Sequence, residues 1–115
     1  MTKGERKTAR RHLIYFSEVR DQGGAILKGH LADISTSGLM ILTKEKVEEG
    51  RSLRLEVLLP EEVEGRDRIR FRARSLWCRQ DVNPDYYATG LSIEEIDMVD
   101  RELIEYLIFE YGFNG

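Results

Sequence analysis

Two stretches in the middle of this 115-residue chain alternate apolar and polar residues with a period of two. Between Arg51 and Leu59, the apolar positions are Leu53, Leu55, Val57 and Leu59. Between Arg68 and Trp77, they are Ile69, Phe71, Ala73 and Trp77, while arginines occupy positions 68, 70, 72 and 74. Because a strand turns successive side chains to opposite faces, this period predicts two strands with one buried and one wet face.

Further strands are predicted where β-prone or apolar residues run between turn signals, at residues 13–19, 25–34, 38–43 and 86–93. Turns are predicted at residues 21–24, 48–50 and 81–85, and an acidic loop at residues 60–65. So many short antiparallel strands would expose unpaired edges unless the sheet closed on itself.

A helix is predicted at the end of the chain, with Asp97 as its N-cap, Asp100 as a helix-start partner and Gly112 as its end. Its apolar stripe comprises Val99, Leu103, Ile104, Leu107, Ile108 and Tyr111. The fold class is therefore mainly β: a small six- to seven-stranded antiparallel β-barrel of the split-barrel type with one C-terminal α-helix. The sequence leaves open whether the wide apolar face of this helix is all core or partly a homodimer surface.

Charge is unevenly distributed along the chain, whose net charge is −3. Residues 1–11 contain Lys3, Arg6, Lys7, Arg10 and Arg11 against one acidic residue, Glu5. No core-forming apolar residue precedes Leu13, so residues 1–12 are predicted to be a flexible basic arm and residues 13–115 the folded domain. A local basic arm on an acidic body suits a small anion better than a long nucleic acid.

The remaining composition argues against several other classes of protein. The single cysteine, Cys78, excludes an internal disulfide, and the distant His12 and His30 give no zinc spacing. We find no nucleophile–base pair and no phosphate-cradling glycine loop, so we expect no enzyme and no metal. No apolar run is long enough to span a membrane and no signal peptide is evident, which predicts a soluble cytoplasmic protein.

The segment Asp33-Ile34-Ser35-Thr36-Ser37-Gly38 is a polar, glycine-ended turn between two apolar runs. Its carboxylate and hydroxyls can accept hydrogen bonds from the N–H groups of a base. Arginine forks in the basic arm can bind phosphate and the acceptor edge of guanine. Together, the arm and the turn suggest a site for a guanine-containing phosphate ligand.

The spacing of these residues carries a family resemblance. Arg6-Lys7-Thr8-Ala9-Arg10 reads as RxxxR, and the turn at residues 33–38 reads as (D/N)xSxxG. In this order, the two motifs resemble those of the PilZ domain family, receptors for the bacterial second messenger cyclic di-GMP. The resemblance extends from Arg6 to the last helix and implies the same barrel, with cyclic di-GMP as ligand and no other cofactor. Ala9 departs from the family, which often places proline before the second arginine.

The resemblance also implies roles for individual residues. Arg6 and Arg10 would bind the phosphates and guanine edges, with Lys7 and Arg11 assisting through charge; the equal spacing of Lys7 and Arg11 leaves the register open. Asp33 would accept from guanine donors and Ser35 would offer a hydroxyl. Gly38 would let the backbone approach the ligand, and it can also adopt a positive φ.

Other prominent residues have structural explanations. We interpret the arginines at positions 68–74 as an outer strand face paired with acidic neighbours such as Glu56. Trp77 is expected in the core and is only a weak candidate for ligand contact. Gly90 is expected at a bulge or a close packing contact, and Cys78 is expected to be partly buried.

The resemblance implies a switch in which the ligand orders the basic arm across the barrel, creating a surface that an unknown partner protein reads. Motility, biofilm and exopolysaccharide control are the implied outputs. Two other functions stay open on sequence alone. The chain could be a PilZ-like interaction adaptor without nucleotide, or a small barrel that binds single-stranded nucleic acid, although the lack of aromatics among the arginines disfavours the latter.

Overall fold

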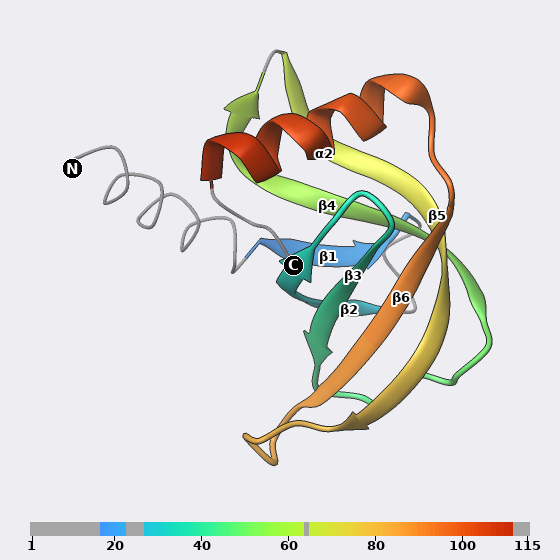
Figure 1. Cartoon of the computed structure of the whole chain (residues 1–115). Helices are drawn as coiled ribbons and strands as arrows, with labels where there is room; N and C mark the ends of the chain where they lie inside the picture. Colours follow the sequence, from blue (N-terminus) through green and yellow to red (C-terminus); the bar gives the residue numbers. More distant parts are fainter. Residues whose placement is uncertain (1–16, 23–26, 64, 112–115) are drawn as a thin grey trace.

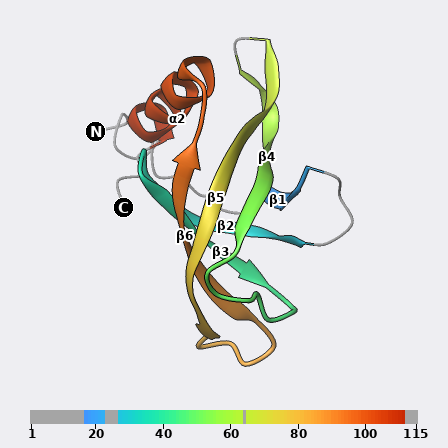
Figure 2. The same cartoon turned by 90° about the vertical axis from the view of Figure 1, so that its right-hand side faces the viewer.

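A computed structural model describes residues 17–22, 27–63 and 65–111, which form a closed barrel of six antiparallel strands and a helix. The strands are β1 (Glu18–Asp21), β2 (Lys28–Ile34), β3 (Gly38–Thr43), β4 (Ser52–Val63), β5 (Arg66–Gln80) and β6 (Tyr87–Glu95); the helix is α2 (Met98–Tyr111). Their order around the barrel is β1-β2-β3-β6-β5-β4. Figures 1 and 2 show α2 lying over one end of this barrel. The predicted fold class is confirmed.

Alternation along β4 and β5 builds the centre of the barrel. The inward positions are almost completely buried and pack with those of the other strands; in β4 and β5 they are Leu53, Leu55, Val57, Ile69, Phe71 and Ala73. On the outer face, the arginines of β5 alternate with these buried residues. Because the two strands pair along most of their length, their two apolar faces form one continuous interior wall.

The predicted acidic loop at residues 60–65 is wrong. β4 and β5 continue into this segment and meet in a tight turn, where Gly65 adopts a φ of 79°. Proline cannot donate to a strand ladder, so within a sheet it is found at edges and at bulges. The register between β4 and β5 is irregular between Leu58 and Val63, and Pro60 lies in this irregular part of the pairing.

The predicted inward direction of Trp77 is also wrong. β5 has an irregular register between Ser75 and Trp77, and the residue between them, Leu76, is 55% exposed. Ser75 pairs with Leu91, and Trp77 pairs with Gly90. The extra residue shifts the strand's phase by one, so Trp77 turns to the outer face, as expected at a bulge. The close packing expected at Gly90 is confirmed, because an added Cβ would lie 2.3 Å from the Trp77 ring.

The helix begins as predicted, since the Asp97 carboxylate accepts a hydrogen bond of 2.9 Å from the Asp100 backbone N–H. Most of the predicted stripe is confirmed, because Leu103, Ile104 and Leu107 are buried and Ile108 packs against the core. Val99 is the exception: it is 58% exposed, and the neighbouring Asp100 is buried. Asp100 forms an ion pair with Arg66 at the start of β5. This charge pair turns Asp100 inward and leaves Val99 on the solvent side.

The other elements largely agree with the sequence. β3 has the predicted bounds, the turns at residues 48–50 and 81–85 are present, and Gly50 has a φ of 79°. β1 and β2 pair as the predicted hairpin, in which the Asp21 carboxylate accepts from the Leu27 N–H. β6 continues two residues beyond the predicted end, to Glu95. The predicted strand start at Leu13 lies outside the described residues.

Candidate functional site

The turn between β2 and β3 lies at the end of the barrel that α2 covers (Figures 1 and 2). Ser35 holds this turn together. Its backbone N–H donates to the Gly38 carbonyl at 2.8 Å, while its Oγ accepts from the N–H groups of Ser37 and Gly38 at 3.3 and 3.2 Å. These bonds fix the loop before any ligand arrives, so the turn is a preformed set of polar groups.

Asp33 stands at the start of this turn with spare hydrogen-bonding capacity. One carboxylate oxygen accepts from the next residue's N–H, at Ile34, over 2.9 Å. Among the described residues, no lysine or arginine forms an ion pair with Asp33. The side chain is half-buried, so its second oxygen is an acceptor held on a rigid strand end. That is the arrangement expected of a group that recognises N–H donors.

Gly38 is required by close packing between strands, and the positive φ predicted as its reason is wrong. The positive-φ glycines in the described part of the chain are Gly50 and Gly65. At Gly38, an added Cβ would lie 2.4 Å from the carbonyl oxygen of Leu91 on β6. A side chain here would push β3 from β6 and disturb the turn.

A small hollow of about 190 Å³ opens at the turn. Its lining consists of Asp33, Ile34, Ser35, Gly38, Leu39 and Met40. The structure therefore brings the three predicted turn residues together around one concave surface. Met40 was not predicted as a site residue, because its place beside Asp33 follows from strand register.

Strand register connects this hollow to Trp77. Asp33 pairs with Met40, Met40 with Gly90, and Gly90 with Trp77, so these four residues form one row across β2, β3, β6 and β5. Neighbouring strands lie about 4.8 Å apart, so the row spans about 14 Å. The Trp77 ring packs on Gly90, and the Arg79 guanidinium lies 4.5 Å from the ring centroid. The row thus joins a carboxylate acceptor to an aromatic platform.

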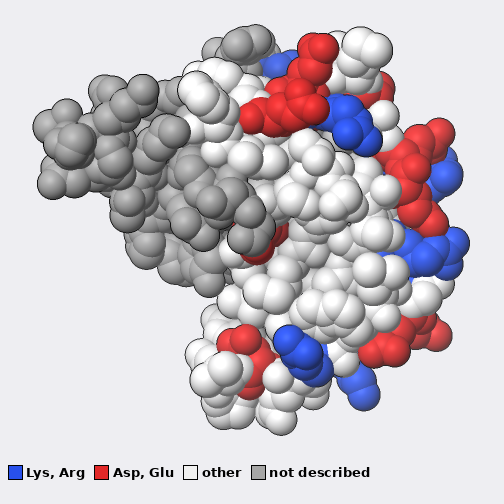
Figure 3. All heavy atoms as spheres, in the orientation of Figure 1, with Lys and Arg blue, Asp and Glu red and all other residues white. Residues whose placement is uncertain are grey.

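Apart from Asp33 at one end and Arg79 beside Trp77 at the other, the surface around this row carries little charge. Figure 3 shows a broad uncharged area in the centre of the face over β3 and β6, with Lys, Arg, Asp and Glu at its margins. We define this surface as the neutral face: its partly exposed residues are Asp33, Met40, Leu42 and Trp77, and the buried Ala88 and Gly90 belong to the same area. It offers apolar and aromatic contact to a flat group, and its fixed carboxylate lies at one end.

The arginines of β5 make a different surface, the arginine face, defined as Arg20, Arg68, Arg70, Arg72 and Arg74. Glu56, whose side chain is 3% exposed, contacts Arg20 at 2.8 Å and both Arg68 and Arg70 at 3.3 Å. Glu94 contacts Arg74 at 2.7 Å, and Arg72 lies 3.2 Å from Glu95. The predicted pairing of this ladder with acidic neighbours is confirmed.

Electrostatics of the carboxylates follow from these contacts. Burial raises the pKa of the Glu56 carboxyl, but hydrogen bonds from Arg20 and Arg70 and the charge of Arg68 reverse this effect, so the pKa lies below its ordinary value of 4.5. The pKa of Glu94 is lowered by hydrogen bonds from Ser52 and Arg74. Both carboxylates therefore stay ionised near neutral pH and balance the arginines.

The remaining predicted site residues lie outside the described part of the chain. These are the four basic residues of the arm, Arg6, Lys7, Arg10 and Arg11.

Cys78 is partly buried, as expected, and its sulfur accepts from the Val47 N–H at 3.4 Å. Within the described residues, no helix is long and apolar enough to cross a membrane.

Comparisons with known proteins agree with this architecture. A family model of the PilZ domain matches residues 5–110. The solved structure of the Bacillus subtilis inhibitor of motility MotI/DgrA is similar, with a TM-score of 0.68 and 26% identity over 82% of this chain and 46% of that chain. This chain therefore spans about half the length of MotI.

A second solved structure, the PilZ domain with c-di-GMP of YcgR from Escherichia coli, has a TM-score of 0.62 and 15% identity. The match covers 84% of this chain and 80% of that chain, and it shows a shared fold. No curated protein sequence matches this chain.

Proposed function

This chain belongs to the PilZ domain family, and from that premise we propose that it binds cyclic di-GMP and relays the signal to a partner protein. The family is one of ligand-binding and adaptor domains and not of enzymes. The observation that carries the proposal is the row from Asp33 to Trp77. It places a carboxylate that forms no ion pair with the described residues, a preformed turn and an aromatic ring on one neutral face.

Each group on this face suits one part of a guanine nucleotide. Asp33 accepts from guanine N–H donors, and the Ser35 hydroxyl provides a second polar contact. Gly38 keeps the backbone close to the base. Trp77 gives a ring on which a base can stack, an interaction worth about 1–3 kcal/mol per base. The neutral face thus recognises the bases and leaves the phosphates to cations elsewhere.

The basic arm supplies those cations in this proposal. Arg6 and Arg10 bind the phosphates through charge-assisted, bidentate hydrogen bonds, and Lys7 and Arg11 add positive charge. Binding orders the arm over the neutral face and makes a combined surface of arm and ligand. A partner protein reads this surface, and the similarity to an inhibitor of motility favours motility as the output.

Isothermal titration of the purified chain with cyclic di-GMP, with GTP as control, tests the proposal. We expect saturable binding of the cyclic ligand alone, and the titration also gives its stoichiometry. No heat and an unchanged amide NMR spectrum would favour an adaptor that does not bind nucleotide.

Replacing Arg10 by Ala sharpens this test. We expect Arg10→Ala to weaken binding by about 2–5 kcal/mol, the cost of truncating one partner of a hydrogen-bonded charge pair. Arg70→Ala is the matched control, because Arg70 already pairs with Glu56 on the arginine face, and binding should not change. If Arg6→Ala and Arg10→Ala both bind like the parent, the arm is not the clamp.

A further inference from the structure

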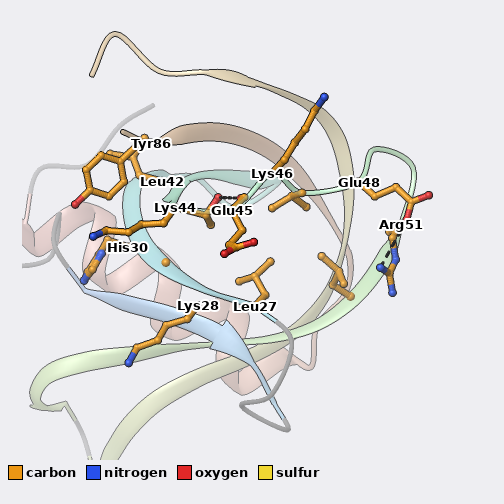
Figure 4. Close-up of a pocket in the computed structure, with 14 residues that line it drawn as sticks. Leu27, Lys28, His30, Leu42, Lys44, Glu45, Lys46, Glu48, Arg51 and Tyr86 are labelled. Carbon is orange, nitrogen blue, oxygen red and sulfur yellow. Dashed lines mark hydrogen bonds and ion pairs between the residues drawn. The ribbon is translucent and has the colours of Figure 1, made fainter. Parts of the chain in front are cut away.

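A larger cavity, of about 450 Å³, opens at the mouth of the barrel. Its lining comes from the start of β2, the end of β3, the segment that follows β3, and the start of β4. The turn at residues 33–38 follows the opposite end of β2, and the six steps from Lys28 to Ile34 span about 20 Å. The mouth cavity therefore lies at the opposite end of β2 from the turn at residues 33–38, although Leu42, at one edge of the neutral face, also lines it. Figure 4 looks into the mouth, with α2 behind the barrel.

The cavity has an apolar floor and a fixed wall. Leu27 and Leu53 are buried members of the core, and Val47 packs against that core from the wall. The wall is tied at two points: the Thr43 hydroxyl donates to the Glu45 carbonyl at 2.6 Å, and the Val47 N–H donates to the Cys78 sulfur at 3.4 Å. The volume lies in the range of small-molecule sites, which are mostly apolar and preformed.

Basic side chains gather on one side of the opening. Figure 4 shows Lys28, His30 and Lys44 together on this side, whereas Arg51 and Glu48 lie opposite them. Arg51 pairs with Glu48 at 3.7 Å, and Lys28 lies 3.9 Å from Glu18. Among the described residues, Lys44 forms no ion pair, and its ammonium lies 5.9 Å from the Tyr86 ring centroid.

The charge of this cavity is opposite to that of the chain. Four lysines and arginines line it against two glutamates, although the net charge of the chain is −3. An apolar floor beside a cationic rim matches a molecule with an aliphatic tail and one anionic head. We propose that the mouth cavity binds a medium-chain carboxylate. Its tail lies against Leu27, Val47 and Leu53, and its carboxylate lies near Lys28, His30 and Lys44.

Glu45 is a lining residue that opposes the binding of an anion in this cavity. Figure 4 shows its carboxylate over the opening, above Leu27, and its charge repels an anionic head. Glu45→Gln removes this repulsion and keeps the size of the side chain. We expect this variant to bind a carboxylate about two- to fivefold more tightly, the range for one partly exposed charge pair.

Methyl NMR on the full chain provides the test, with octanoate, octanol and octyltrimethylammonium as probes of equal tail length. We expect octanoate to bind about fivefold more tightly than octanol and to shift the methyl signals of Leu27, Val47 and Leu53. The cationic probe should bind weakest. Hexanoate should bind about 15-fold more weakly than octanoate, because two fewer methylenes are buried.

Three variants test whether the probes bind in this cavity and not at the surface in general. Lys28→Glu combined with Lys44→Glu should reverse the preference, so that octyltrimethylammonium binds more tightly than octanoate. Arg101→Glu makes one such charge reversal at an exposed position of α2, half the charge change of the double variant, and should leave the preference unaltered. Val47→Phe should fill the cavity and abolish octanoate binding. The probe series on the parent chain decides the question even where that variant does not fold.

The proposal stands without cyclic di-GMP, so its failure is distinct from failure of the proposed function. It is overturned if octanol binds as tightly as octanoate. Methyl shifts that avoid the cavity floor would also overturn it, as would an unchanged preference in the doubly reversed variant.

Discussion

The arginine face and the neutral face lie on the same barrel, yet the face with more positive charge is the poorer candidate for anion binding. On the arginine face, Glu56 and Glu94 lie within hydrogen-bond distance of the guanidinium groups. On the neutral face, Asp33 forms no ion pair with any described residue, and Trp77 is partly exposed with Arg79 beside its ring. Our proposal therefore rests on which polar groups lack a partner among the described residues and not on the number of charges.

Glu56→Gln tests the arginine face and should have the largest effect on stability. It leaves Arg20, Arg68 and Arg70 close together without their shared carboxylate, and we expect the free energy of unfolding to fall by about 3 kcal/mol. Urea unfolding measures this loss. The affinity for cyclic di-GMP should stay at the parent value. A fall in affinity alongside the loss of stability would contradict the view that the two faces act separately.

Acid should remove the same contribution. The pKa of Glu56 is lower in the folded protein than its ordinary value of 4.5, so the stabilisation is complete above about that pH and is lost as the pH falls through the folded-state pKa. The difference in unfolding free energy between the parent and Glu56→Gln should therefore shrink from pH 7 to pH 3. A constant difference would show that packing, and not charge, explains the effect.

On the neutral face, Asp33→Ala should lower the affinity for cyclic di-GMP and leave the stability almost unchanged, the reverse of Glu56→Gln. Losing a carboxylate acceptor should weaken cyclic di-GMP binding by about 2 kcal/mol, as for other hydrogen bonds to charged groups. The free energy of unfolding should change by under about 1 kcal/mol, because only one hydrogen bond, to the Ile34 N–H, is lost. Titration calorimetry and urea unfolding on the same sample separate these effects. Ser37→Ala, at an exposed position in the same turn, is the control.

Gly90→Ala should have the smallest effect of the four. The new Cβ displaces the Trp77 ring, and we expect a loss of about 1 kcal/mol in stability with weaker ligand binding. In a Trp77→Ala background the same change should cost almost nothing. A double-mutant cycle measures this coupling. An equal loss of stability in both backgrounds would mean that glycine is required here by the backbone and not by the packing of the Trp77 ring.

Several errors of the sequence interpretation share one physical cause. Period-two patterning gives the inward residues of β4 and β5 correctly, up to the bulge before Trp77. A bulge inserts one residue, so every later side chain of the strand points to the opposite face. No residue type in the sequence indicates where this bulge lies. The extension of β4 through Pro60 depends in the same way on how β4 pairs with β5, whose register is irregular between Leu58 and Val63. Both features belong to the pairing of strands and not to either strand alone.

The helix and the site show the same contrast between features set by neighbouring residues and features set by contacts across the fold. Asp97 as N-cap and the turn chemistry of Asp33 and Ser35 are local, so sequence reasoning finds them. The burial of Asp100 beside the exposed Val99 goes with the ion pair between Arg66 and Asp100, residues far apart in the chain. Met40 and Gly90 join the site through register across β3 and β6.

By itself, the sequence determined the closed antiparallel barrel, the C-terminal helix and the polar turn, because alternation, capping and turn formation act over a few residues. Tertiary structure alone decided which outer face is neutralised, which way Trp77 points, and that Asp33 and Trp77 share one row. The physical reason is that ion pairing and strand register depend on partners that the chain brings together only when it closes the barrel.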